Sequence, residues 1–157
     1  MQVREATSDD APDVLAVHRA AIGAIEPGAY TAAQLDAWAA AQDDPTQYPF
    51  DDAGQYLAVA ETDAAGVVGF VGVDRADGVL ETLYVHPDHA GMGVGSDLLT
   101  HAERVLREAG HHRVVMAASR NAVPFYERHG YETTPETFDL EMGRETLSFV
   151  RMERPLD

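Results

Sequence analysis

The fold is decided by the stretch Leu80–Gly110, LETLYVHPDHAGMGVGSDLLTHAERVLREAG, in which a strand pattern, a glycine-rich loop and a helix pattern follow one another. The loop glycines are Gly91, Gly93 and Gly95, each separated from the next by one residue. In the helix pattern, apolar residues recur at helical spacing and form one face over 94–109. The stretch therefore predicts a strand–loop–helix unit.

Such a loop is a candidate phosphate site. Alternating glycines let backbone N–H groups face one way, and a ligand can approach without meeting a Cβ atom. The start of the following helix adds unpaired N–H donors and the positive end of a dipole. Two standard phosphate motifs are excluded, because the chain has no lysine for a Walker loop and lacks the third glycine of the dinucleotide fingerprint. A purely structural turn remains the alternative.

Outside this stretch, the patterns predict a mixed α/β domain. Helices are expected over 8–25, 31–42 and 122–130, and strands over 3–7, 56–62, 66–74 and 112–119. A polar loop is expected over 43–55, and 131–156 is expected to form a strand, a loop over Thr133–Gly143 and a last strand. The expected order is βααβββαβαββ, in a single domain over 1–157 with a sheet covered by helices.

The charge balance is strongly acidic. The chain has 27 acidic and 11 basic residues, a net charge of −16, and all its basic residues are arginine. A dense carboxylate surface keeps a protein soluble in molar salt, where the salt screens self-repulsion. The composition thus favours a protein from a halophilic organism, with a merely acidic protein as the alternative. It argues against a nucleic-acid partner, since phosphate contacts need clustered Lys and Arg.

Several other classes are excluded or disfavoured by composition. The chain has no cysteine, which excludes disulfides and thiolate metal sites. The sequence has no apolar run of membrane-spanning length and no signal-peptide pattern, so we expect a cytoplasmic protein without a membrane partner. His86 and His89 have an H-x-x-H spacing, but no acidic ligand accompanies them at helical spacing, and no metal site is expected.

Two motifs resemble those of the GNAT N-acetyltransferases. LYVHPDHAGMGVGSDLL resembles the family's acetyl-CoA-binding motif, Arg/Gln-x-x-Gly-x-Gly/Ala, with Gly93 and Gly95 as its glycines and Ala90 where the family usually has Arg or Gln. NAVPFYERHGYE, at 121–132, resembles the family's Asn-…-Phe-Tyr-x-x-x-Gly-Phe/Tyr region. The resemblance covers nearly the whole chain and implies the GNAT fold and direct acetyl transfer from acetyl-CoA to an amine.

The resemblance also implies a donor site and a catalytic acid. Main-chain N–H groups of a splayed strand would polarise the thioester, the glycine loop would bind the pyrophosphate, and Asn121 would bind the CoA arm. Tyr126 would be the general acid that protonates the leaving thiolate, with a core aromatic beside Phe125 as its alternative role. The acetyl-CoA-binding residues implied are Leu83, Tyr84, Val85, Gly91, Met92, Gly93, Val94, Gly95, Ser96, Asn121 and Phe125.

Glu81 is the first candidate for the base that deprotonates the amine, and a solvent-facing strand carboxylate is its alternative role. His18 and His86 are weaker candidates, and the reaction can also proceed without a dedicated base. In this family the first two helices form one wall of the acceptor site, so Tyr30, Trp38 and the 22–29 segment are acceptor-side candidates, as is the 133–143 loop. Packing is the alternative for Trp38.

The acceptor implied is a small-molecule amine, an amino acid or a peptide, and another acyl donor such as succinyl-CoA remains open. Dimers are common in the family, so a homodimer is a further expectation. The alternative function is a non-catalytic acyl-CoA-binding module, which Ala90 and the unassigned base keep open.

Overall fold

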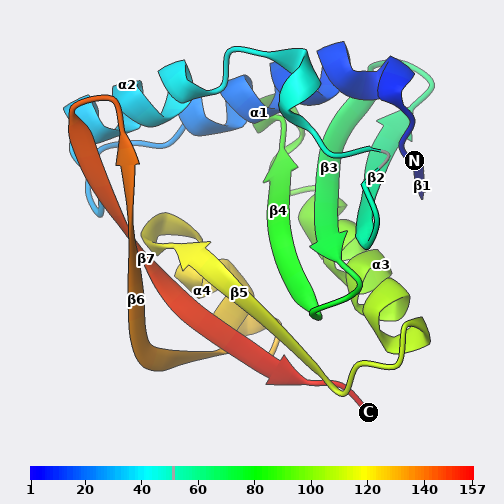
Figure 1. Cartoon of the computed structure of the whole chain (residues 1–157). Helices are drawn as coiled ribbons and strands as arrows, with labels where there is room; N and C mark the ends of the chain where they lie inside the picture. The colour runs from blue at the N-terminus through cyan, green and yellow to red at the C-terminus, as the bar shows by residue number, and fades with distance from the viewer. Residues whose placement is uncertain (51) are drawn as a thin grey trace.

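The computed structural model describes residues 1–50 and 52–157, and within these ranges the chain forms a seven-stranded sheet with helices on both faces (Figure 1). The strand order across the sheet is β1-β2-β3-β4-β5-β7-β6. This architecture confirms the expected mixed α/β fold and the expected order of helices and strands. The elements are β1 (Gln2–Glu5), α1 (Ala11–Gly23), α2 (Ala32–Ala41), β2 (Gln55–Thr62), β3 (Gly66–Asp74), β4 (Val79–Val85), α3 (Val94–Glu108), β5 (Arg113–Ser119), α4 (Val123–Arg128), β6 (Glu132–Met142) and β7 (Glu145–Pro155).

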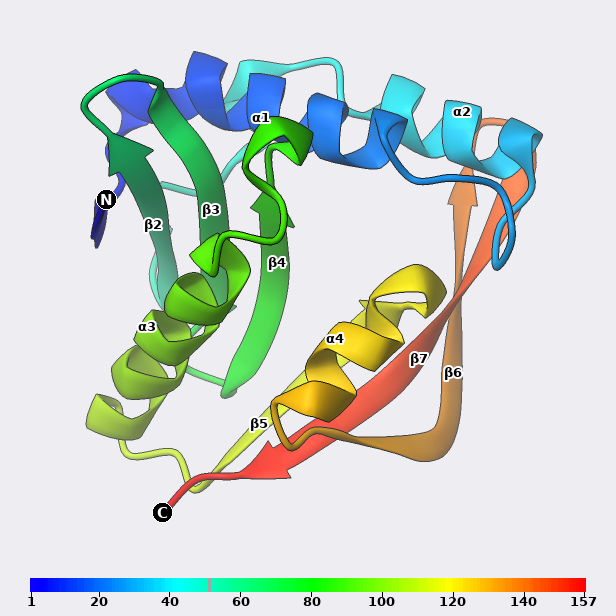
Figure 2. The same ribbon diagram turned by 180° about the vertical axis from the view of Figure 1, so that it is seen from behind.

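The helices form two layers, one on each face of the sheet. Val71 of β3 packs in one apolar cluster with Leu98 of α3, whereas its neighbour Phe70 packs in another cluster with Val14 of α1. Side chains alternate between the two faces of a strand, so adjacent residues supply both cores. Figure 2, seen from behind, shows α3 and α4 in front of the sheet, with α1 and α2 running across its top. The apolar clusters place α3 and α4 on one face of the sheet and α1 and α2 on the other.

The expectation of a loop over 133–143 was wrong, because this segment forms most of strand β6. Its residues pair with β7 in unbroken antiparallel register from Thr137↔Val150 to Met142↔Glu145, and Gly143 turns the chain with a φ of 62°. Pro135 lies where the register shifts between Thr133 and Thr137. A bulge tolerates a residue that cannot donate to the ladder, which is why a proline can occur in this strand.

The first helix begins later than expected. A 3-10 turn covers Ser8–Asp10, and α1 begins only at Ala11. The Asp10 carboxylate accepts hydrogen bonds from the Arg4 guanidinium, at 2.9 Å to each oxygen, and from the Thr7 N–H at 2.8 Å. These bonds hold the turn before the helix.

The loop expected over 43–55 includes a 3-10 turn at Pro45–Gln47, and its residue 51 lies outside the described residues. Among the helices of the described ranges, none has both the length and the apolar character that crossing a membrane requires.

Candidate functional site

Strands β4 and β5 are neighbours in the sheet that separate along most of their length. In the part of the chain that the structure describes, one register pair joins them, Val79↔Val115, near the first residues of both strands. Figure 1 shows the two parallel strands diverging beyond this point. The gap contains a small cavity of about 40 Å³. Its lining residues are Leu80, Glu81, Thr82, Leu83, Tyr84, Met116, Ala117, Ser119 and Tyr126.

The main chain of β4 directs two N–H groups into this gap. The N–H of His86 donates to the Val68 carbonyl on the β3 side at 2.8 Å. N–H groups of successive residues point to opposite edges of a strand, so those of Leu83 and Val85 point away from β3. The edge they reach is the one that β5 leaves open, where they can donate to a ligand oxygen.

The glycine loop between β4 and α3 presents further N–H donors. Gly91 and Gly93 have φ values of 76° and 84°, which glycine adopts without strain. Gly93 is the N-cap of α3 and has no side chain to bond the N–H groups of the first turn, so these remain open to a ligand. Helix starts of this kind bind phosphate.

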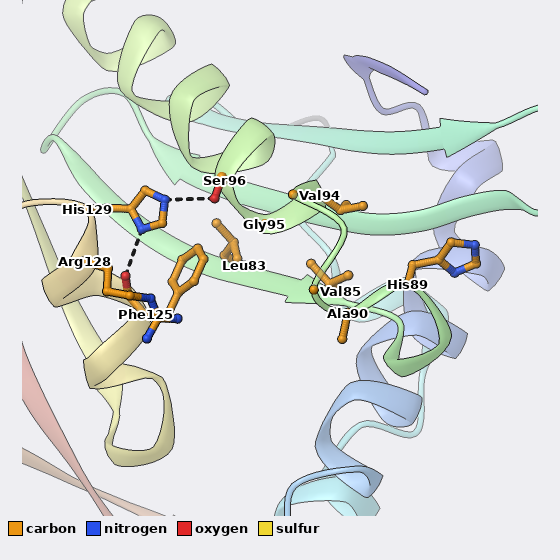
Figure 3. Close-up of a pocket in the computed structure, with 12 residues that line it drawn as sticks. Leu83, Val85, His89, Ala90, Val94, Gly95, Ser96, Phe125, Arg128 and His129 are labelled. Carbon is orange, nitrogen blue, oxygen red and sulfur yellow. Dashed lines mark hydrogen bonds between the residues drawn. The ribbon is translucent and has the colours of Figure 1, made fainter.

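A cavity of about 420 Å³ lies over this loop (Figure 3). The loop and the end of β4 form one wall, and α4 forms the other. Its lining residues are Leu83, Val85, His89, Ala90, Gly91, Gly93, Val94, Gly95, Ser96, Phe125, Arg128 and His129. Leu83 lines both this cavity and the gap between β4 and β5, so the two spaces adjoin.

Two contacts hold α4 against the start of α3. A Cβ atom added at Gly95 would lie 3.2 Å from Cζ of Phe125, so a larger residue at this position would require the Phe125 ring to move by a few tenths of an ångström. The His129 Nδ1–H donates to the Phe125 carbonyl at 2.8 Å, because a carbonyl can only accept. The His129 Nε2 then accepts the Ser96 hydroxyl at 2.9 Å. These bonds fix the width of the cavity.

Sequence reasoning missed Arg128 and His129. Both line the cavity, and Figure 3 shows Arg128 beside Phe125 on the wall opposite Ala90. Arg128 brings a cation to a site where Ala90 supplies none. The sequence contained a pattern that could have identified them, because residues three and four positions after Phe125 lie on the same side of a helix as Phe125.

Tyr126 lies at the gap between β4 and β5. Its side chain is 6% exposed, and it lines the gap together with Leu83. Burial raises the pKa of the Tyr126 phenol well above its usual value, so the hydroxyl stays protonated at neutral pH. A protonated phenol facing the open edge of β4 can donate a proton there.

Glu81 occupies a β-bulge. The register between β3 and β4 shifts from Gly72↔Thr82 to Val73↔Leu80, which leaves Glu81 as the extra residue. Its carboxylate is exposed and accepts a hydrogen bond from Gln55 Nε2 at 3.2 Å. Gln55 lies two residues before Leu57, which packs in the α1 cluster, so the carboxylate is on the α1 side of the sheet.

The two histidine candidates for the base differ in setting. His18 is 5% exposed, its Nδ1 lies 2.9 Å from the Tyr48 hydroxyl, and its ring is 4.3 Å from that of Tyr84. Burial lowers the pKa of His18 to about 4, so it is neutral at pH 7. The His86 Nδ1 accepts the Asp88 N–H at 3.1 Å, as the cap of the turn that follows β4.

The acceptor-side candidates are packed rather than exposed. Tyr30 and Trp38 are each 3% exposed and belong to an apolar cluster with Phe149. Tyr84 also packs on this face, with its ring 6.4 Å from that of Trp38. Its side chain therefore lies on the side of the sheet opposite the glycine loop. The roles of Tyr30 and Trp38 in acceptor binding, and of Tyr84 in acetyl-CoA binding, stay predictions.

Two of the predicted acetyl-CoA-binding residues are exposed. Met92 is 70% exposed at the loop, and Asn121 is exposed in the 3-10 turn Arg120–Ala122 after β5. Both can reach a ligand from the surface. Among the described residues no group of three or more His, Asp or Glu side chains could hold a metal ion.

Comparisons with known proteins agree with this geometry. Residues 27–156 match the family described as the Acetyltransferase (GNAT) domain. A crystal structure of a GCN5-related N-acetyltransferase from Rhodopseudomonas palustris is 28% identical, with a TM-score of 0.88 over 99% of this chain and 95% of that one. The PaiA N-acetyltransferase of Thermoplasma acidophilum, solved with coenzyme A, has the same fold, at 18% identity and a TM-score of 0.77 over 98% of each chain.

Among curated relatives, a glucosamine 6-phosphate N-acetyltransferase of Trypanosoma brucei brucei is 29% identical over 68 residues, 43% of this chain and 46% of that protein. The chain spans about half the length of the curated relatives it matches.

Proposed function

Since the chain belongs to the GNAT acetyltransferase family, we propose that it transfers an acetyl group from acetyl-CoA directly to the amine of a small molecule, an amino acid or a peptide. The observation that carries this proposal is the junction of two spaces at Leu83. The cavity over the glycine loop suits the phosphates and pantetheine arm, and it adjoins the gap that Tyr126 lines.

In this proposal the phosphates of acetyl-CoA bind the N–H groups between Gly91 and Ser96. Arg128 supplies a positive charge at the phosphates, which Ala90 cannot supply. Backbone N–H groups at the start of a helix bind an anion by direct hydrogen bonds. In concentrated salt, which screens the charge of the arginine side chain, these hydrogen bonds add to its contribution.

The thioester carbonyl lies in the gap and accepts hydrogen bonds from the N–H groups of Leu83 and Val85. These donors stabilise the charge that develops on the oxygen. A neutral amine attacks from the α1 side of the sheet, where Glu81 takes its proton directly or through a water. The new C–N bond forms, the C–S bond breaks, and Tyr126 protonates the departing thiolate.

The first test is thermal unfolding with and without acetyl-CoA. At about a hundred times its Kd a ligand adds roughly 2.7 kcal/mol of stability. For a chain of this size that corresponds to a rise of about 5–10 °C in Tm. Absence of a rise in both low salt and molar KCl, with folded protein, would contradict the donor site.

The second test is release of the CoA thiol with a panel of amines. The panel contains L-amino acids, small alkyl amines, glucosamine 6-phosphate and a peptide with a free N-terminus. Release that depends on an amine supports the transferase. A protein that binds acetyl-CoA but releases thiol with none of the amines would favour the non-catalytic acyl-CoA-binding module instead.

A further inference from the structure

Beyond their one register pair, the two halves of the sheet need other contacts to set the width of the gap. The β4 half consists of β1–β4, and the β5 half of β5, β7 and β6. They join at Val79↔Val115, at the narrow end of the gap. The wide end, where Leu83 and Tyr126 both line the gap, has no strand pairing among the described residues.

Trp38 of α2 contacts both halves near the wide end. Its ring centroid is 6.4 Å from that of Tyr84 on β4 and 5.7 Å from that of Phe149 on β7. Phe149 in turn pairs in register with Ser119, the last residue of β5. The buried indole is therefore a spacer of fixed size between the two halves.

Tyr30, in the connection between α1 and α2, binds the end of β5. Its hydroxyl donates to the Ser148 carbonyl on β7 at 2.8 Å and accepts the Arg120 N–H at 3.0 Å. Its ring is 5.8 Å from that of Trp38. Arg120 directly follows β5 and begins the turn that leads to α4, the helix that carries Tyr126.

We propose that Tyr30 and Trp38 are positioning residues that set the gap between β4 and β5, Trp38 as the spacer and Tyr30 as the hydrogen-bonded anchor of the β5 end. They place Tyr126 relative to the N–H groups of Leu83 and Val85. This inference rests on the proposed function and deepens it: the α1–α2 segment acts through the geometry of the donor gap rather than by contact with the amine.

Tyr30→Phe tests the anchor, because it removes the hydroxyl and keeps the ring. We expect faster hydrogen exchange at the Arg120 amide, which loses its acceptor. We also expect kcat, per acetyl-CoA-binding site, to fall about tenfold or more with the panel amine that releases thiol fastest, since small misplacements of reacting groups cost rate steeply. Counting binding sites removes unfolded protein from the comparison.

Tyr56→Phe is the matched control. It removes another phenol hydroxyl, which lies 2.8 Å from His101 Nε2 on α3, away from the gap. Trp38→Phe tests the spacer independently: the smaller ring should lower kcat per site, as Tyr30→Phe does. Trp38 is the only tryptophan, so its fluorescence should also change when acetyl-CoA enters the gap of the wild-type protein.

The proposal is overturned if Arg120 exchange or kcat per site is unchanged in Tyr30→Phe, or if Tyr56→Phe lowers kcat equally. A wild-type protein that binds no acetyl-CoA would instead overturn the proposed function, and the catalytic role of both positioning residues with it. An active wild-type enzyme with an equally active Tyr30→Phe variant overturns this inference alone.

Discussion

Replacing Tyr126 with phenylalanine should separate catalysis from stability. Burial is the cause that raises the pKa of this phenol, and no hydrogen bond to a described residue contributes. The substitution therefore removes a proton donor without leaving a described partner unsatisfied. We expect the free energy of unfolding to change by less than about 1 kcal/mol. The kcat for acetyl transfer should fall by about 10²- to 10⁴-fold, the usual contribution of a general acid.

Tyr131 provides a control for this substitution, because it is a second buried tyrosine whose ring centroid lies 5.8 Å from that of Tyr126. Its hydroxyl donates to the buried Glu103 carboxylate at 2.8 Å, and Arg154 is the second donor to the same oxygen at 2.6 Å. Tyr131→Phe leaves that oxygen with one donor fewer, which should cost about 1–3 kcal/mol of stability. In a chain of this length, this lowers Tm by roughly 2–12 °C. The kcat per folded enzyme should stay near the wild-type value.

The assay pairs thiol release under saturating acetyl-CoA with thermal unfolding of the same preparations. The expected result is a double dissociation, in which Tyr126→Phe loses turnover and Tyr131→Phe loses stability. Tyr126→Phe should retain the wild-type Tm rise on adding acetyl-CoA. Equal kcat in Tyr126→Phe and wild type would refute the assignment of Tyr126 as the acid, and the phenol would then be a packing residue.

Three other perturbations test the remaining charges. Arg128→Ala should weaken acetyl-CoA binding about tenfold at low salt and less in molar KCl, whereas Arg19→Ala on α1 should not, as isothermal titration in both salts can check. The His18 pKa is about 4 in the folded protein against 6.5 unfolded, so the unfolded chain binds more protons between these values and stability should fall by up to about 3 kcal/mol as pH drops from 6.5 to 4. His18→Gln should flatten that part of the denaturation profile, and an unchanged slope would contradict the assignment. If the net charge of −16 is an adaptation to salt, Tm should rise between low salt and molar KCl, and a flat response would indicate a merely acidic protein.

The features that could be predicted from the sequence are short-range. Predicting the turn at Gly91 and Gly93 requires only the conformations of neighbouring residues. Predicting the helix that follows requires only the spacing of its own apolar residues. The pair Phe125 and Tyr126 belongs to a motif twelve residues long. Local conformation and side-chain periodicity are properties of a few consecutive residues, so the element order and the glycine loop between a strand and a helix could be inferred without a structure.

The tertiary structure decided what depends on distant partners. Residues 133–142 form a strand because β7 lies beside them, and no pattern within the segment specifies that partner. The hydroxyl of Tyr30 meets the N–H of Arg120, 90 residues away, and the bulge at Glu81 arises from its register with β3. The gap between β4 and β5 exists because the two strands pair at one point and then diverge, an arrangement that depends on the packing of the whole sheet rather than on the residues of either strand.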